Sequence, residues 1–226
     1  MGETANQKLM KKGAEASLYT AYWHGRKVTI KKRLPKKYRL PELDEEIKTH
    51  RTARESQLIY EAKRAGVPTP SLYFVDVGNA AIIMEFVEGK QVKQLLGEIT
   101  EQRRRDICIK IGESVGRIHR CAIVHGDLTT SNMILNPEGK IVFVDFGLGE
   151  KSADLESQGV DLHLMKRSLE STHFRFAEKC FLHVIEGYSR IVGSKTAKKI
   201  EDRIEEIENR GRYVSERKGR QKSVHN

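Results

Sequence analysis

The feature that most constrains the fold is a set of polar residues at fixed spacing in the middle of the chain. In "VHGDLTTSNMIL" (124–135), an acid, Asp127, stands five positions before an amide, Asn132. Thirteen residues further on, the apolar stretch "KIVFVDFG" (140–147) carries Asp145 at its end. The pattern predicts hard oxygen ligands on a loop and at the end of a short buried strand.

Two further residues upstream complete a recognisable set. "VTIK" places Lys31 on a predicted strand, and Glu55 lies in a long charged segment with helical spacing. Phosphoryl transfer needs magnesium on oxygen ligands, cations on the phosphates and a carboxylate near the attacking group. Asn132 and Asp145 supply the metal ligands, Lys31 the cation held by Glu55, and Asp127 the base or water-orienting group. Each residue alone fits an ordinary surface or turn position, but their order makes the set specific.

The order of the elements predicts an α+β protein with a two-lobe plan and a cleft between the lobes. A strand-rich part with one long helix comes first, and a mainly helical part follows. The boundaries expected are an N-lobe at 1–87, a C-lobe at 88–208 and a basic tail at 209–226. The expected strands are within 7–33, at 72–78, 80–89 and 140–147, and the expected helices are at 43–65, 101–120, within 157–192 and at 195–208.

Composition describes an ordinary, rather polar globular protein of 226 residues, with 38% hydrophobic and 32% charged residues. No apolar run is long enough to predict a membrane span, and the N-terminus lacks the apolar core of a signal peptide. The three widely spaced cysteines form no CxxC pair. Reduced thiols in a cytoplasmic protein are the simplest interpretation.

The net charge of +10 favours a polyanionic partner or a phosphate-bearing ligand. Basic residues concentrate in "KKRLPKKYR" (31–39) and in the tail at 209–226. The tail is a candidate for contacts with RNA phosphates or for supplying a cation near the nucleotide. The alternative for these charge runs is a solvated surface and a frayed terminus. For the tail, truncation after Asn209 with measurement of ATP turnover and RNA binding would decide.

These motifs together resemble the eukaryotic-type protein kinase superfamily from about residue 9 to about 190. Within it, the chain is most similar to the kinase-like subunit of the KEOPS (EKC) complex, the PRPK family. The segments that carry this resemblance are "KKGAEA" (11–16), "IKKRLPKKYRLPELDE" (30–45), "RTARESQLIYEAKRAGVPTP" (51–70), "MEFVEG" (84–89), "VHGDLTTSNMIL" (124–135), "FVDFGLG" (143–149) and "GVDLHLMKRSLESTH" (159–173).

The resemblance implies a compact protein with a reduced bilobal, protein-kinase-like fold. It also implies that the protein binds ATP and Mg²⁺ and has Ser/Thr kinase and ATPase activity. The implied partners are the threonylcarbamoyl-transferase subunit and the Cgi-type subunit of that complex, together with transfer RNA. It also implies that Met84 lies at the back of the adenine pocket and that backbone groups of Glu85 and Val87 bind the base. Asp161 resembles the acid that braces the catalytic loop, and His125 is expected to shape that loop.

Several positions depart from the kinase pattern. The phosphate loop is reduced to Gly13, Ala14, Glu15 and Ala16, so its backbone N–H groups would cap the phosphates beside a negative charge. The negative charge of Glu15 is expected to weaken ATP binding. The alternative is that this charge serves a different purpose. Gly126 and Thr129 replace two common basic residues, and no "APE" motif follows Asp145.

These departures leave two functions of different kinds. The first is an atypical kinase or Mg-ATPase that supports threonylcarbamoyladenosine modification of transfer RNA. The second is a catalytically weak scaffold that binds partner proteins and transfer RNA. RIO kinases and choline or aminoglycoside phosphotransferases are further candidates, disfavoured by the "DFG" sequence and by the short chain respectively.

Overall fold

The computed structural model describes residues 5–223, with side chains over residues 6–210. The chain forms two compact units, and each is described here by itself. The first unit contains residues 1–92 and 131–150, and the second contains 93–130 and 151–226. The α+β protein-kinase-like fold expected from the sequence is confirmed, whereas the lobe boundaries at 1–87, 88–208 and 209–226 stay a prediction.

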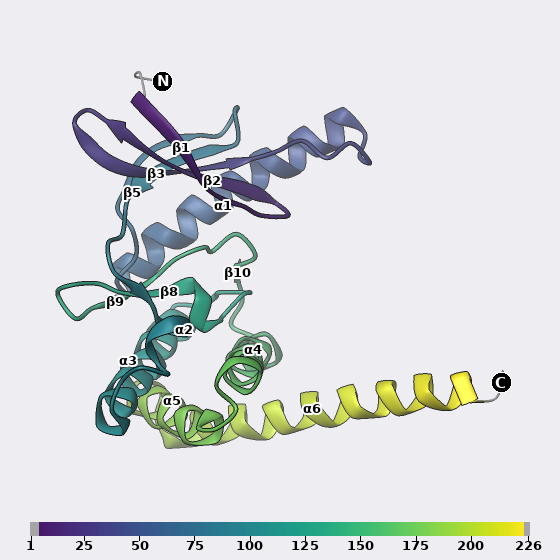
Figure 1. The fold of residues 1–226 in the computed structure, drawn as a ribbon. Helices are drawn as coiled ribbons and strands as arrows, with labels where there is room; N and C mark the ends of the chain where they lie inside the picture. Colours follow the sequence, from purple (N-terminus) through teal and green to yellow (C-terminus); the bar gives the residue numbers. More distant parts are fainter. Residues whose placement is uncertain (1–4, 224–226) are drawn as a thin grey trace. The chain divides into compact units, whose positions relative to one another are not determined.

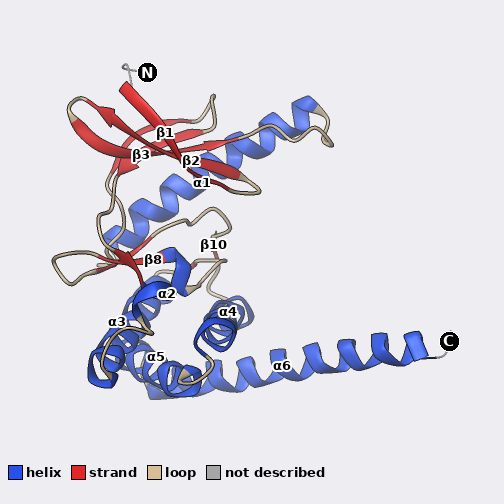
Figure 2. Ribbon diagram, viewed as in Figure 1, coloured by secondary structure: helices blue, strands red, loops and turns tan. Residues whose placement is uncertain are grey.

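The first unit is built on a five-stranded antiparallel sheet in the order β1-β2-β3-β5-β4 (Figures 1 and 2). Its strands are β1 (Ala5–Lys12), β2 (Ala16–Trp23), β3 (Arg26–Arg33), β4 (Leu72–Asp76) and β5 (Ala81–Glu85). Valine, isoleucine and aromatic residues give β2, β3, β4 and β5 their strand preference.

The alternation of side chains along β3 separates a core face from a polar face. Val28 and Ile30 join a buried cluster with Ala21 and Ile83. Lys31 and Arg33, one and three positions after Ile30, share the opposite face, and both residues are buried. Two adjacent buried cations require partners of opposite charge.

The long helix α1 (Pro41–Arg64) supplies one such partner. Proline in its first turn suits a helix start, and acids in that turn with bases in the last turn complement the helix dipole. Its buried side chains include Thr52, Glu55 and Leu58. Because Glu55 is buried on a helix that packs against the sheet, its carboxylate is expected to form an ion pair with the buried cations of β3.

A second, three-stranded sheet in this unit has the order β6-β8-β9. Its strands are β6 (Lys90–Gln91), β8 (Met133–Leu135) and β9 (Ile141–Phe143), and a short 3-10 helix at Thr130–Asn132 precedes β8. In the antiparallel hairpin of β8 and β9, Met133 is opposite Phe143. The residues just outside this pair therefore meet at the same open end of the hairpin.

The second unit is mainly helical. It contains α2 (Val92–Leu95, whose first residue closes the first unit), α3 (Glu101–Arg120), α4 (Leu155–His173), α5 (Ala177–Val192) and α6 (Ser194–Ser223). The predicted helix at 101–120 is confirmed. The remaining short strands, β7 (Ile123–Val124) and β10 (Glu150–Lys151), pair in a two-stranded sheet.

Helices α3 and α5 approach each other unusually closely because of two glycines. A Cβ atom on Gly112 would lie 1.9 Å from the carbonyl oxygen of Val184, and one on Gly187 would lie 2.0 Å from that of Ile109. Any larger residue would push the helices apart. The glycine pair thus fixes the spacing of the side chains on both helices.

The helices expected within 157–192 are α4 and α5, with a break at 174–176. The last helix differs from the sequence expectation. Helix α6 continues to Ser223, past the expected end at residue 208, because the polar 209–223 segment contains no proline. Of the basic tail, the side chains beyond Arg210 lie outside the described residues. Within the described part of the chain, no helix is long and apolar enough to cross a membrane.

Candidate functional site

A buried ion-pair network lies in the first unit, between β3, α1 and the segment after β9. The Lys31 Nζ lies 2.7 Å from Glu55 Oε1 and 2.5 Å from Asp145 Oδ1. Side-chain exposure is 7% for Lys31, 1% for Glu55 and 45% for Asp145. Glu55 is thus a buried anchor, whereas Asp145 presents part of its side chain to solvent.

The two carboxylates keep Lys31 charged. Burial alone would lower the pKa of Lys31, but the charges of Glu55 and Asp145 and their hydrogen bonds outweigh it, so the pKa is raised. An ammonium group that stays protonated in a buried position is suited to bind an anionic ligand that replaces one of its carboxylate partners.

Arg33 is a second cation on Glu55, and the sequence analysis did not identify it. Its Nη2 lies 2.6 Å from Glu55 Oε2, and its Nη1 donates a hydrogen bond to Thr52 Oγ1 at 3.2 Å. Both oxygens of Glu55 are therefore occupied, one by each cation. A signal was available, because Arg33 is two positions from Lys31 on one strand and must share its face.

Replacing Arg33 by methionine is expected to destabilise the protein by roughly 2–4 kcal/mol, because one oxygen of the buried Glu55 loses its charged partner. The free energy of unfolding from urea denaturation measures this effect. Arg51→Met is the matched control, since Arg51 pairs with Glu15 at 2.7 Å in an exposed position, where loss of the pair costs about 1 kcal/mol or less. Equal losses in both variants would contradict a structural role of Arg33.

Asn132 and Asp145 lie together at the open end of the hairpin formed by β8 and β9. The Val144 N–H donates to the Asn132 carbonyl oxygen at 2.9 Å, which extends the pairing by one residue. Asp145 follows at once, with a left-handed φ of 65°. This conformation is unfavourable for most residues but tolerated by aspartate, and it occurs often at functional sites.

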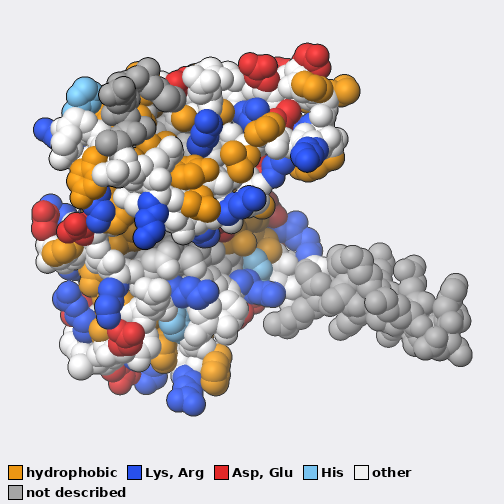
Figure 3. Space-filling view, turned by 45° about the horizontal axis from the view of Figure 1, so that its top comes forward, with side chains coloured by type: hydrophobic (Ala, Val, Ile, Leu, Met, Phe, Trp, Pro, Cys, Tyr) orange, Lys and Arg blue, Asp and Glu red, His pale blue; other side chains and the backbone are white. Residues whose placement is uncertain are grey.

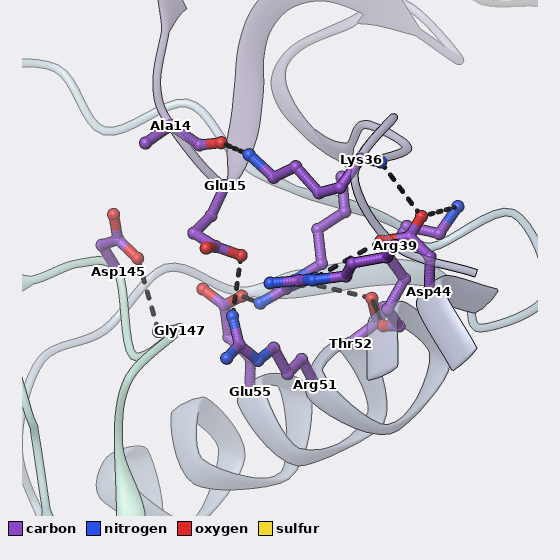
Figure 4. A network of polar contacts seen from close by, with 12 residues as sticks. Ala14, Glu15, Lys36, Arg39, Asp44, Arg51, Thr52, Glu55, Asp145 and Gly147 are labelled. Carbon is purple, nitrogen blue, oxygen red and sulfur yellow. Dashed lines mark hydrogen bonds and ion pairs between the residues drawn. The ribbon is translucent and has the colours of Figure 1, made fainter. Parts of the chain in front are cut away.

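The reduced phosphate loop is a tight connection between β1 and β2. The Gly13 N–H donates to the Ala16 carbonyl oxygen at 2.9 Å, and a Cβ atom on Gly13 would lie equally close to that oxygen. Glu15 is bound to Arg51 of α1, and the Lys36 ammonium contacts the Ala14 carbonyl oxygen (Figure 4). In this structure the charge of Glu15 is thus directed to α1.

The three residues expected near the adenine base lie at the end of β5 and just beyond it. Met84 is buried, and Glu85 and Val87 are half-buried. The Glu85 N–H donates to the Ser71 carbonyl oxygen at 2.8 Å, and its carboxylate accepts from the Ser71 N–H at 2.9 Å. The Glu85 side chain therefore ties β5 to the chain before β4.

The remaining site residue, Asp127, belongs to the second unit, where it is half-buried. Its N–H donates to the Nδ1 of His125 at 3.3 Å. Asp161 of α4 accepts from the His125 N–H at 2.7 Å and from the Gly126 N–H at 2.8 Å. The expectations that Asp161 braces this loop and that His125 shapes it are confirmed.

Asp161 is itself held by a buried pair. Its Oδ2 lies 3.2 Å from His119 Nε2, and His119 Nδ1 lies 3.1 Å from the Tyr188 hydroxyl. Burial alone would raise the pKa of Asp161, but the hydrogen bonds and charges of His119 and His125 outweigh it, so the pKa is lowered. Asp161 is therefore an ionised, fully satisfied carboxylate in the core of the second unit.

The oxygen donors of the first unit fit magnesium with a phosphate ligand. Within the described residues, no group of three or more His, Cys, Asp or Glu could hold a metal ion by itself. Asp145 and Asn132 instead offer one carboxylate and one amide at a hairpin end. Mg²⁺ is usually bound by one or two carboxylates with the substrate's phosphates completing its shell, so this donor set fits the ion.

Comparison with known proteins identifies the family of this chain. A family model described as "Protein kinase domain" matches residues 5–175, which is more than half of the chain. The sheet-rich unit with its Lys–Glu pair and the helical unit with its braced Asp127 loop have the elements of that class. The class of protein that the fold and the site define is therefore the protein kinase family.

Three relatives narrow this assignment. "KEOPS complex subunit Bud32" of Pyrococcus abyssi is 45% identical over 212 residues, which is 91% of this chain and 96% of the relative. "EKC/KEOPS complex subunit bud32" of Dictyostelium discoideum is 36% identical over 90% of this chain and 82% of the relative. The chain belongs to the protein kinase family and, within it, to the Bud32 family.

A third relative is a larger protein. The "Probable bifunctional tRNA threonylcarbamoyladenosine biosynthesis protein" of Methanothermobacter thermautotrophicus is 46% identical over 91% of this chain. The match covers only 36% of that relative, so the chain spans about a third of its length. This chain therefore corresponds to one part of the bifunctional protein.

Proposed function

We propose that the chain is an atypical Mg²⁺-dependent ATPase and Ser/Thr kinase that acts as a subunit of a KEOPS-type complex. In that complex it supports the threonylcarbamoyladenosine modification of transfer RNA. The observation that carries the enzymatic part is the contact of one buried ammonium, Lys31, with both Glu55 and Asp145. The names of the relatives support the part that concerns the complex and transfer RNA.

Each site residue of the first unit has a role in this proposal. Lys31 exchanges its contact with Asp145 for the nucleotide phosphates while Glu55 and Arg33 keep it in place. Asp145 and Asn132 would hold Mg²⁺, which would neutralise the charge of the phosphates. Backbone groups of Gly13, Ala14, Glu15 and Ala16 cover the phosphates, and Met84, Glu85 and Val87 contact the adenine base.

Asp127 of the second unit orients the attacking hydroxyl or water and takes its proton. The role follows from its place in the family's HxDxxxxN pattern. His125 and Asp161 act through the loop backbone, which they hold in one conformation. The proton acceptor is thereby supplied by a rigid loop rather than a mobile one.

The partners proposed are the threonylcarbamoyl-transferase subunit, the Cgi-type subunit and transfer RNA, and the location proposed is the cytoplasm. The alternative function is a scaffold with little catalysis. Two observations favour it: the phosphate loop is a tight turn tied to α1, and only the short segment 146–154 separates Asp145 from α4. The first feature restricts the loop that would cover the phosphates, and the second leaves little surface for a protein substrate.

ATP turnover by the purified chain tests the proposal. ADP release is expected to require Mg²⁺ and to fall about 100-fold in Asp127→Asn, because the amide cannot accept the proton. Asp106→Asn, on α3 of the same unit, is the control and should leave turnover unchanged. If turnover is absent both in the isolated chain and with its transferase partner, the scaffold function is correct.

A further inference from the structure

A cationic pocket lies on the second unit, where the start of α3 meets the start of α5. Its volume is about 250 Å³. Four permanent cations line it (Arg104, Arg105, Arg175 and Lys179), and Glu101 is the acid among its lining residues. Its cations come from three places in the sequence that are brought together by the close approach of α3 and α5.

The pocket has one cation that is fixed in advance. The Arg104 Nε donates to the Leu96 carbonyl oxygen at 2.9 Å, and its Nη2 donates to that of Ile99 at 3.0 Å. Its guanidinium lies 3.8 Å from the centre of the Phe176 ring. A guanidinium held this way needs no further ordering when an anion binds, which lowers the entropic cost of binding.

The other cations are weakly compensated. Arg105 has an ion pair at 3.6 Å with Glu186, and that carboxylate is held more closely by Arg190 at 2.6 Å. Within the described part of the chain, no carboxylate forms an ion pair with Arg175. Lys179 is bound to Glu101 at 2.9 Å, both side chains being largely exposed. The net charge of the lining is therefore strongly positive.

The N-terminus of α5 adds to this positive potential. Its N-cap residue, Phe176, lines the pocket and provides no side-chain cap for the helix. The first N–H groups of a sixteen-residue helix, together with its dipole, attract anions. Two independent features, the cation cluster and the uncapped helix start, thus select the same ligand charge.

The volume of the pocket indicates which anion fits it, a single phosphate group or a whole nucleotide. Pockets that enclose a ligand of drug size are about 300–1,000 Å³, so this one suits a phosphate group with water rather than a whole nucleotide. Elsewhere, basic side chains are spread over both units and mixed with acidic and apolar ones on the face drawn in Figure 3. The net charge of +10 therefore does not by itself mark a binding surface, whereas this pocket does.

We infer that the pocket at the start of α3 and α5 binds a phosphate group of an RNA backbone. The choice of RNA over a free phosphate rests on the proposed function, but the phosphate site itself rests on the pocket alone. Arg105, Arg175 and Lys179 bind the phosphate oxygens beside the fixed Arg104. Glu101 competes with the phosphate for Lys179, so its carboxylate limits the affinity.

Binding of a fluorescent, unmodified transfer RNA transcript to the full chain at several KCl concentrations tests this site. The pocket variant carries Arg105→Gln, Arg175→Gln and Lys179→Gln, all at exposed positions. It should bind RNA at least about tenfold more weakly at ~0.15 M KCl, with a salt slope reduced by about 2. The control variant, with Arg103→Gln, Lys110→Gln and Lys199→Gln, loses the same charge outside the pocket and should change affinity less than about threefold.

A gain of affinity provides the sharper test. Glu101→Gln should tighten RNA binding about twofold or more, because it frees Lys179 and removes the one acid among the described lining residues. Glu205→Gln, which removes an exposed carboxylate from α6, should have a smaller effect. Equal behaviour of the pocket and control variants, or no gain in Glu101→Gln, would overturn the inference.

Two further measurements are needed. The first distinguishes an RNA phosphate from a free phosphate, and the second distinguishes a failure of this inference from a failure of the proposed function. If the pocket variant loses pyrophosphate binding but keeps RNA binding, the assignment to RNA is wrong. ATP turnover without RNA should be unchanged in the pocket variant. A chain with no ATP turnover whose RNA binding still depends on the pocket would refute the proposed enzyme and leave this site standing.

Discussion

Replacing Asp145 by asparagine is expected to lower the Mg²⁺-dependent turnover of ATP by about 1,000-fold, which is ~4 kcal/mol of transition-state stabilisation. The amide keeps the size of the side chain and one oxygen but loses the negative charge. In the proposed function, that charge is the strongest magnesium ligand at the hairpin end. It also balances Lys31, 2.5 Å away, when no nucleotide is bound.

The loss should not result from unfolding. The Asp145 side chain is 45% exposed, and Lys31 keeps its 2.7 Å contact with the buried Glu55. The urea denaturation curve of Asp145→Asn should therefore lie close to that of the unchanged protein. Glu46→Gln removes one negative charge from an exposed position in the same unit and should retain full turnover. A turnover loss below about tenfold in Asp145→Asn would contradict its role as a metal ligand.

Replacing Asp161 by alanine is expected to lower the free energy of unfolding by roughly 3–5 kcal/mol. The substitution leaves the N–H groups of His125 and Gly126 without their acceptor in the core, and it leaves His119 without its carboxylate. Urea denaturation measures the loss. Because the same contacts hold the loop that carries Asp127, turnover should fall even at temperatures where the variant is folded.

An aspartate on the same helix is the control for this effect. Asp154 is exposed and caps α4 by accepting from the Ser157 N–H at 3.2 Å. Asp154→Ala should cost about 1 kcal/mol, the usual value for a lost N-cap. A similar small loss in Asp161→Ala would show that the buried network contributes little to stability.

The lowered pKa of Asp161 adds a test by pH. A carboxylate whose pKa is lower in the folded protein than its ordinary value of 3.8 stabilises the fold above that value. The stabilisation is lost as the pH falls through the lower, folded pKa. The stability difference between the unchanged protein and Asp161→Asn should therefore be constant near neutral pH and shrink in acid. A difference that grows in acid would contradict the direction of this shift.

The positions of the residues proposed to carry the chemistry were predictable because each follows from a local pattern. Lys31 stands on an alternating strand, and Asn132 and Asp145 flank two short strands whose spacing forces a hairpin. Arg33 was missed because "KKRLPKKYR" is typical of a solvated charge run. The sequence shows that Arg33 is two positions from Lys31. The burial of Arg33, however, depends on how α1 covers the sheet, which the sequence does not show.

The cationic pocket could not be predicted in the same way. Arg105 and Arg175 are seventy residues apart, and each belongs to an ordinary polar helix terminus. They meet only because Gly112 and Gly187 let α3 and α5 pack at backbone distance. A glycine inside a helix is visible in the sequence, but the partner helix that requires it is not.

The dependence of ATP binding on magnesium tests the central claim most directly, since it requires Lys31, Asn132 and Asp145 to act on one ligand. Isothermal titration of the full chain with ATP, with and without Mg²⁺, measures it. Mg²⁺ should tighten ATP binding at least about tenfold in the unchanged protein and in Glu46→Gln, but not in Asp145→Asn. An ATP affinity that is the same with and without Mg²⁺ would contradict the account.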